Sequence, residues 1–279
     1  MLGKLIKHEF RATGRVMLPI LAAVLLLAVM ANVSIRLMDA VDSTFLRFVF
    51  GLVIFLFVIG MIAAAIMTIV IMVSRFYRNL LKDEGYLMHT LPVSVHELIW
   101  SKLIVSFVWF VVTFLVIFLV ILLTGLLQSG TNLAELFIYV PSWAEIKEAL
   151  AQFGITPGTL IRMGVEFILG AILSCVVSCL HFYAAMSLGH MFSKDKILLS
   201  IVFFVAINFA FSLLSTGVAV TAATGTRFFE QAPEMMETVA GSLSFTNGIM
   251  LRAMLLEAVQ GVILYFVTVL GLKKGLNLA

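Results

Sequence analysis

Charged residues are scarce in this chain. Aspartate, glutamate, lysine and arginine make up 12% of its 279 residues, whereas 62% are hydrophobic. The mean hydropathy is +1.16. Soluble domains are typically about half apolar and about a quarter charged. The shortage of charge therefore excludes a soluble globular protein. Apolar runs of about 20 residues recur along the whole sequence, and each is long enough to cross a bilayer as a helix.

Cysteine is almost absent. The chain has 2 cysteines, Cys175 and Cys179, which lie within one apolar run. Their i, i+4 spacing places them on one face of a helix. We expect two free thiols there, because two cysteines alone cannot complete a structural zinc site. The sequence therefore does not indicate a redox or metal-binding function.

Motifs for nucleotide binding and catalysis are also missing. The only Gly-Lys pair is Gly3-Lys4, and no phosphate-binding glycine loop precedes it. The sequence contains neither a His-Glu-x-x-His motif nor a nucleophile elbow. We therefore predict that the chain is not an enzyme and holds no cofactor of its own. Nothing in the sequence indicates a nucleic-acid partner.

Six apolar segments predict an all-α, polytopic integral membrane protein, with residues 1–279 forming a single transmembrane domain. We expect the spans near residues 17–37, 46–73, 103–127, 160–188, 197–221 and 248–272. Residues 1–15 precede them as a basic amphipathic helix of the kind that lies in the membrane interface. Its apolar arc holds Leu2, Leu5, Ile6 and Phe10, and its polar arc holds Lys4, Lys7, His8, Arg11 and Arg15. The alternative is a signal peptide cleaved after Val29-Met30-Ala31.

The distribution of lysine and arginine predicts the orientation. With the N-terminus inside, the cytoplasmic segments hold twelve of the 18 basic residues, and the acidic residues lean to the other side. We therefore expect a multi-pass protein of the bacterial plasma membrane with both termini in the cytoplasm. The extracellular segments 128–158 and 223–247 are too short for folded domains. We expect a short helix over residues 142–153 and short interfacial helices in the second segment.

A few polar side chains fall within the predicted spans, where each is costly and is a candidate for function. They are Arg162, Glu166, His181, Asn208 and Glu257. Arg162 and Glu166 have the i, i+4 spacing that lets them pair with each other. For the others, the sequence favours interhelical hydrogen bonds over a transport role. Glu257 is the one that we also consider as a cavity-lining carboxylate.

Residues 75–102 form the most informative segment. It is too apolar for a solvated loop, and an exposed apolar patch rimmed by charge usually marks a partner surface. Pro92 disfavours helix at the residue before it, so a short helix around residues 84–90 should end there. Ser94 and Glu97 then form a capping box for a helix that runs into the third span. The segment is either an element that couples to a cytoplasmic motor or an interfacial helix on lipid headgroups.

The same segment resembles the ABC-2 type permeases of ABC transporters, particularly those of Gram-positive bacteria. The likeness rests on Arg78-Asn79-Leu80-Leu81, Asp83-Glu84-Gly85-Tyr86-Leu87-Met88, Thr90-Leu91-Pro92-Val93-Ser94, Leu98-Ile99 and Ser101-Lys102. The opening residues 1–11 and the closing residues 273–278 are similar to that family as well. The resemblance implies an elbow helix before the first span, a coupling helix between spans two and three, and outer helices before the sixth span.

The resemblance also implies a docking element and a set of partners. The docking element comprises Asp83, Glu84, Gly85, Tyr86, Leu87, Met88, Thr90, Leu91, Pro92 and Val93. Two permeases, this chain with a second copy or a related chain, would each dock on an ATPase subunit that binds ATP and magnesium. ATP would move the coupling helices and expel a hydrophobic or amphipathic substrate, such as an antimicrobial peptide, a drug or a lipid-like molecule. The alternatives are a non-transporting sensor or immunity partner of such an ATPase and a proton-coupled carrier that uses Glu257.

Overall fold

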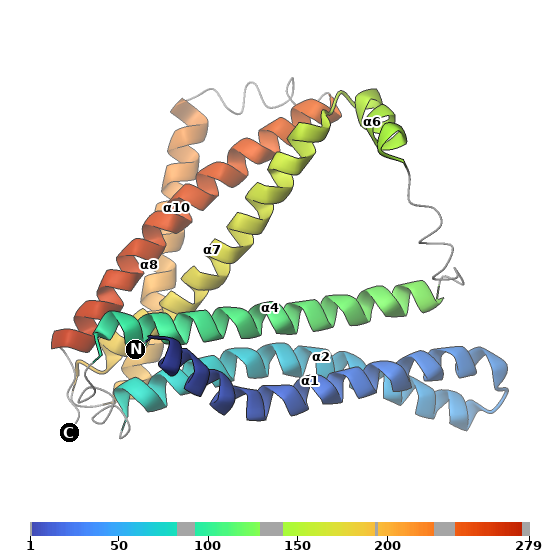
Figure 1. The fold of residues 1–279 in the computed structure, drawn as a ribbon, viewed down its shortest axis with the longest axis horizontal. Helices are drawn as coiled ribbons and strands as arrows, with labels where there is room; N and C mark the ends of the chain where they lie inside the picture. The colour runs from blue at the N-terminus through green and yellow to red at the C-terminus, as the bar shows by residue number, and fades with distance from the viewer. Residues whose placement is uncertain (1, 83–92, 129–141, 193–194, 226–237, 275–279) are drawn as a thin grey trace. The chain divides into compact units, whose positions relative to one another are not determined.

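The computed structural model describes residues 2–82, 93–128, 142–192, 195–225 and 238–274, and within these ranges it is helical without a strand. Its elements are α1 (Leu2–Ala40), α2 (Thr44–Phe76), the π-helix η1 (Tyr77–Leu81), α4 (Val95–Gln128), α6 (Trp143–Gln152), α7 (Pro157–Gly189), α8 (Lys196–Gly225) and α10 (Val239–Lys274) (Figure 1). The predicted all-α fold is confirmed.

Six of the helices are long and apolar enough to cross a membrane. Large apolar side chains cover their outer faces, for example Phe45 (72% exposed), Phe167 (69%) and Leu255 (69%). Such surface is incompatible with water and compatible with lipid chains. The chain is therefore a multi-pass membrane protein, as its composition predicts.

The helices extend beyond the predicted spans. The amphipathic segment 1–15 and the first span form one unbroken helix, α1, with 39 residues and Pro19 inside it. At about 1.5 Å per residue, α1 is roughly 58 Å long, about twice the thickness of the hydrocarbon core. The predicted elbow helix is thus the first part of α1 and not a separate element.

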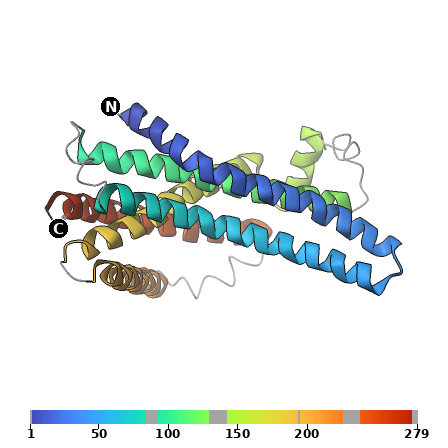
Figure 2. The same ribbon diagram turned by 90° about the horizontal axis from the view of Figure 1, so that it is seen from below.

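Contacts between α-carbons divide the chain into two compact units, which are described separately. Unit 1 comprises Met1–Phe76 and Pro92–Val140, and unit 2 comprises Tyr77–Leu91 and Pro141–Ala279. In unit 1, α1 packs along both α2 and α4, drawn in blue, cyan and green (Figure 2). One core cluster comprises Met17, Leu21, Ile71, Met72, Val105 and Trp109. A second one, of Ala28, Ala31, Phe57 and Val120, lies farther along the same helices.

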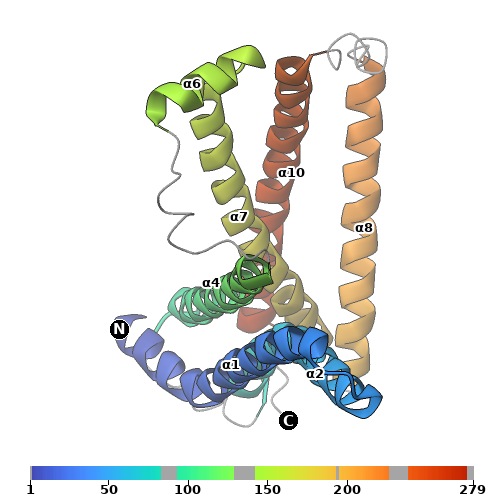
Figure 3. The same cartoon turned by 90° about the vertical axis from the view of Figure 1, so that its right-hand side faces the viewer.

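In unit 2, α7 packs along both α8 and α10 (Figure 3). Thr156 caps the N-terminus of α7, and Pro157 opens it, a position where the missing N–H of proline costs nothing. Small residues let the helices approach closely. A Cβ atom added to Gly271 of α10 would lie 2.8 Å from the Cβ of Ser187. The α7–α10 contact therefore depends on a glycine.

The structure tests the predictions for the two extracellular segments to different extents. The short helix expected over residues 142–153 is present as α6, with Ser142 as its N-cap. In the second segment, residues 223–225 end α8 and residues 239–247 belong to α10. The interfacial helices predicted there fall mainly on residues 226–237, outside the described part of the chain. The free thiols predicted at Cys175 and Cys179 are observed.

Candidate functional site

The predicted docking element lies between the end of α2 and the start of α4. Asp83 to Pro92 fall outside the described residues, so only Val93, which is half-buried, is placed. The capping box that follows is confirmed. The backbone N–H of Ser94 donates to Glu97 Oε2 at 3.1 Å, and the N–H of Glu97 donates to Ser94 Oγ at 3.2 Å. α4 thus begins at a defined residue directly after the predicted element.

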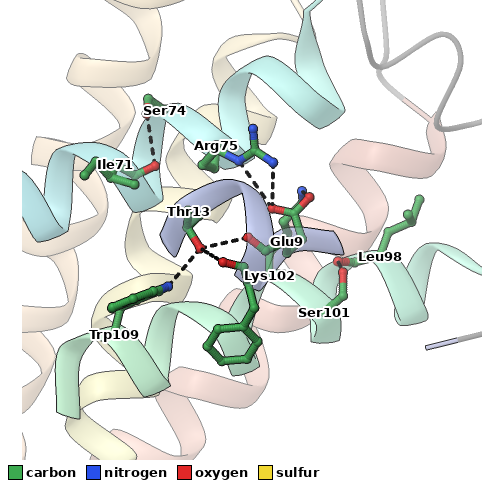
Figure 4. Close-up of polar contacts among 10 residues, drawn as sticks. Glu9, Thr13, Ile71, Ser74, Arg75, Leu98, Ser101, Lys102 and Trp109 are labelled. Atoms are coloured by element: carbon green, nitrogen blue, oxygen red, sulfur yellow. Dashed lines mark hydrogen bonds and ion pairs between the residues drawn. The ribbon is translucent and has the colours of Figure 1, made fainter. Parts of the chain in front are cut away.

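A buried ionic cluster joins the three helices of unit 1 near this point (Figure 4). Glu9 of α1 is its centre, with a side chain that is only 6% exposed. Its Oε2 accepts hydrogen bonds from Nε of Arg75 at 3.3 Å and from Nη2 at 3.2 Å. Its Oε1 forms an ion pair with Nζ of Lys102, whose side chain is 3% exposed. One carboxylate therefore binds a cation from α2 and a cation from α4.

A second polar contact continues the cluster one turn along α1. The indole N–H of Trp109 donates to Thr13 Oγ1 at 2.8 Å. The hydroxyl of Thr13 donates in turn to the backbone oxygen of Glu9, also at 2.8 Å. The ring of Phe10 packs against that of Trp109, with 6.2 Å between the centroids. Trp109 belongs to the first core cluster and Phe10 packs against it, so the polar contacts adjoin a packed apolar layer.

Separating the charges in this cluster would cost free energy of folding. A buried ion needs a partner of opposite sign, and removal of one partner of a buried pair costs about 3–5 kcal/mol. Glu9 is the only acidic residue among residues 1–38, so the first turns of α1 offer no other carboxylate for Arg75 and Lys102. Arg75 lies in the last turn of α2, and Lys102 lies near the start of α4. The shared carboxylate therefore fixes both flanks of the predicted docking element to α1.

Sequence reasoning missed this cluster, although a signal was present. At about 100° per residue, Glu9 and Thr13 fall within the apolar arc of residues 1–15 and not on its basic side. A carboxylate inside an apolar arc indicates a buried partner. The structure agrees, because Glu9 and Thr13 are 5% and 4% exposed.

In unit 2, a buried histidine contacts the π-helix η1, which follows α2 in the chain. His190 follows α7 as its C-cap, and its side chain is buried. Its ring lies edge-on to that of Tyr77 in η1, with 5.2 Å between the centroids. Its Nδ1 lies 3.0 Å from the carbonyl oxygen of Met186. Burial lowers the pKa of His190 below its ordinary value of 6.5, and the charge of Lys196 adds to this effect.

Most of the polar residues predicted within the spans have partners in unit 2. Arg162 and Glu166 form the predicted i, i+4 ion pair, at 3.6 Å. Ser174 of α7 donates to Glu257 Oε2 of α10 at 2.8 Å. His181 Nε2 lies 2.7 Å from the amide nitrogen of Gln260. The interhelical bonds favoured for Glu257 and His181 are therefore observed.

Asn208 differs from its prediction. Its amide donates to the carbonyl oxygen of Phe204 in its own helix at 2.8 Å, and the side chain is exposed. The sequence favours a bond to a neighbouring helix, whereas the bond found in the described part of unit 2 lies within α8. An exposed amide in the middle of a span is costly unless another polar group meets it.

In the described ranges, no three histidine, cysteine, aspartate or glutamate side chains form a group that fits a metal ion. No family model, curated protein or solved structure matches this chain. Only the residues themselves and the resemblance of the segment between α2 and α4 therefore point to a function.

Proposed function

We propose that this chain is the transmembrane permease subunit of an ABC-2 type exporter. It would move a hydrophobic or amphipathic substrate, such as an antimicrobial peptide, a drug or a lipid-like molecule, across a bacterial plasma membrane. The energy would come from two separate ATPase subunits that bind ATP and magnesium. The docking element comprises Asp83 to Met88 and Thr90 to Val93.

The observation that carries the proposal is the ionic cluster at Glu9. A docking element transmits force only when both of its flanks are stiff. Arg75 and Lys102 lie on these two flanks, and both bind the same buried carboxylate. A push on the element would therefore move α1, α2 and α4 together, instead of bending a loop. A connection that merely lies on headgroups has no need of such a cluster.

The charge distribution supports a cytoplasmic location for this end. Lys4, Lys7, Arg11 and Arg15 are exposed on the first turns of α1, which extend past the length needed to cross the bilayer. Basic residues flanking the spans favour the cytoplasmic side. An ATPase in the cytoplasm would then meet the docking element, and both termini of the chain would lie on the same side.

The free face of α8 supports a second permease copy or a related permease as partner. Within the described residues, α8 packs mainly on α7, and Asn208, Ser212 and Ser215 are all exposed. Their i, i+4, i+7 spacing places them on one stripe of the helix. Amides and hydroxyls in a membrane find partners in neighbouring helices. A related stripe on a second permease would supply these partners.

The proposal is tested by the ATP hydrolysis of the co-purified complex. We expect Tyr86→Asp to abolish the stimulation of the ATPase by the permease, because a carboxylate enters an apolar contact. Tyr86→Phe is the matched control and should retain stimulation. Membrane insertion of both variants is checked by their yield in purified membranes. Full stimulation with Tyr86→Asp would refute the docking assignment.

A further inference from the structure

Helix α6 has two chemically different faces. Trp143, Ile146, Leu150 and Phe153 follow helical spacing and form one apolar face. The opposite face holds Glu145, Glu148 and Gln152. The structure buries none of the residues of α6, and Trp143 and Phe153 are each 55% exposed. Within the described part of unit 2, Ile146 and Leu150 are half-buried, whereas Trp143 and Phe153 at the two ends of this face remain mostly exposed.

The ends of α6 are well defined. The N–H of Ser142 donates to Glu145 Oε2 at 2.7 Å, and the N–H of Glu145 donates to Ser142 Oγ at 3.3 Å. After Phe153, Gly154 adopts a φ of +69° that ends the helix. A helix of 10 residues is nevertheless marginal in water unless its apolar face is buried. The capping therefore fixes where α6 begins and ends, and something else must stabilise it.

The position of α6 identifies what covers that face. Residues 153–156 are all that separate it from Pro157, where the membrane-crossing helix α7 begins. Four residues span at most about 14 Å. Leu160 and Ile161 in the first turns of α7 are already 49% and 59% exposed, as expected of residues that face lipid. α6 also turns away from the axis of α7 instead of continuing it (Figure 3). If α7 begins at the bilayer surface, α6 lies at the depth of the lipid headgroups.

The side chains of α6 fit that depth. Tryptophan is favoured where one part of a side chain meets hydrocarbon and the other meets water. Nζ of Lys147 lies over the ring of Trp143, 5.9 Å from its centroid. This places an ammonium group at the edge of the apolar face, where it can reach headgroup phosphates. With two glutamates against one lysine, α6 carries no net positive charge that would select anionic lipids.

We propose that α6 is an interfacial anchor whose apolar face, formed by Trp143, Ile146, Leu150 and Phe153, inserts into the bilayer surface at the start of α7. The partner is the phospholipid surface itself, and it is bound through apolar insertion and not through headgroup charge. The anchor sets the depth of α7 in the membrane. This inference holds whether or not the chain docks on an ATPase, so the two proposals fail separately.

The test measures the fluorescence of Trp143 in the full chain in lipid vesicles. The difference between the emission of the unmodified chain and that of Trp143→Phe isolates this residue. We expect phosphatidylcholine brominated near the headgroup end of its chains to quench Trp143 more than lipid brominated near the chain ends. Vesicles with added phosphatidylglycerol, and high salt, should give the same quenching.

Two matched variants test the face. Phe153→Asp places a charge in the apolar face and should expose Trp143 to the water-soluble quencher acrylamide, with loss of quenching by the bromolipid. Gln152→Asp changes the opposite face and should leave both signals unchanged. The proposal is overturned if bromolipids do not quench Trp143, whether water or protein covers it. It is overturned as well if quenching occurs only in anionic vesicles.

Discussion

Lys102 and Glu9 form an ion pair in which both side chains are almost fully buried, at 3% and 6% exposure. The residues lie 93 positions apart in the sequence. This pair, together with Arg75 on the same carboxylate, connects the first turns of α1 to the helices on both sides of the predicted docking element. The helices α1, α2 and α4 are thereby held as one stiff body at this end of unit 1.

We expect Glu9→Gln to destabilise the protein by about 3 kcal/mol, because the carboxylate shared by buried Lys102 and half-buried Arg75 is removed. The free energy of unfolding in mixed detergent micelles measures the effect. Glu148→Gln on exposed α6 is the matched control and should change stability by less than about 0.5 kcal/mol. Lys102→Met added to Glu9→Gln should restore part of the loss, since the buried ammonium group is then removed together with the carboxylate. Equal effects of Glu9→Gln and Glu148→Gln would contradict the cluster.

Gly189→Ala should weaken the contact between α7 and α8. The added Cβ would lie 2.6 Å from the backbone nitrogen of Ser200, which cannot move away as a side chain does. A cost of about 1–3 kcal/mol is expected for such overpacking. Gly164→Ala, on the same helix, meets no atom within 4 Å and should be neutral or stabilising by up to about 1 kcal/mol. The same unfolding measurement distinguishes the two, and similar values for both would disprove the close approach.

His190 should make stability depend on pH. Its pKa is lowered in the folded protein by burial, so the unfolded chain takes up a proton first. The contribution of His190 to the free energy of unfolding is fully present above its ordinary pKa of 6.5. It is lost as the pH falls through the lowered pKa that His190 has in the folded protein. We expect the free energy of unfolding to decline from about pH 6.5 toward pH 5, and to decline less in His190→Gln. His8→Gln, on an exposed side chain, should retain the decline. A flat profile for the unmodified chain would contradict this assignment.

Glu257 should not carry protons across the membrane. Glu257→Gln retains an oxygen that accepts the hydrogen bond from Ser174, so the fold should be preserved. In proteoliposomes with the co-purified ATPase, ATP hydrolysis should be unchanged in this variant, with or without a pH gradient. A pH-sensitive dye inside the vesicles should also record no ATP-independent proton flux. Such a flux, lost in Glu257→Gln, would favour the carrier alternative.

The sequence predicts the local features well, because each depends on neighbouring residues. The six spans follow from apolar runs. The capping box at Ser94 follows from a glutamate three positions later. The i, i+4 pair of Arg162 and Glu166 follows from helical spacing. None of these features requires knowledge of which helices meet.

The features that depend on helix packing were harder to predict. Glu9 reads as part of a basic amphipathic segment until α2 and α4 bring Arg75 and Lys102 to it. Asn208 reads as an interhelical group, yet only Phe204 of its own helix accepts its bond in the described part of unit 2. No periodicity in the sequence distinguishes the π-helix at Tyr77–Leu81 from α2. Burial and partner choice depend on tertiary contacts that no local pattern contains.

The central claim is that the segment between α2 and α4 docks on a separate ATPase. A photo-activatable residue at position 86 in intact cells tests it most directly, with the same residue at Leu255, which is 69% exposed and expected to face lipid, as the control. The account predicts that position 86 cross-links to a protein that binds ATP and that position 255 cross-links only to lipid. Cross-links from position 86 that reach only lipid would contradict it.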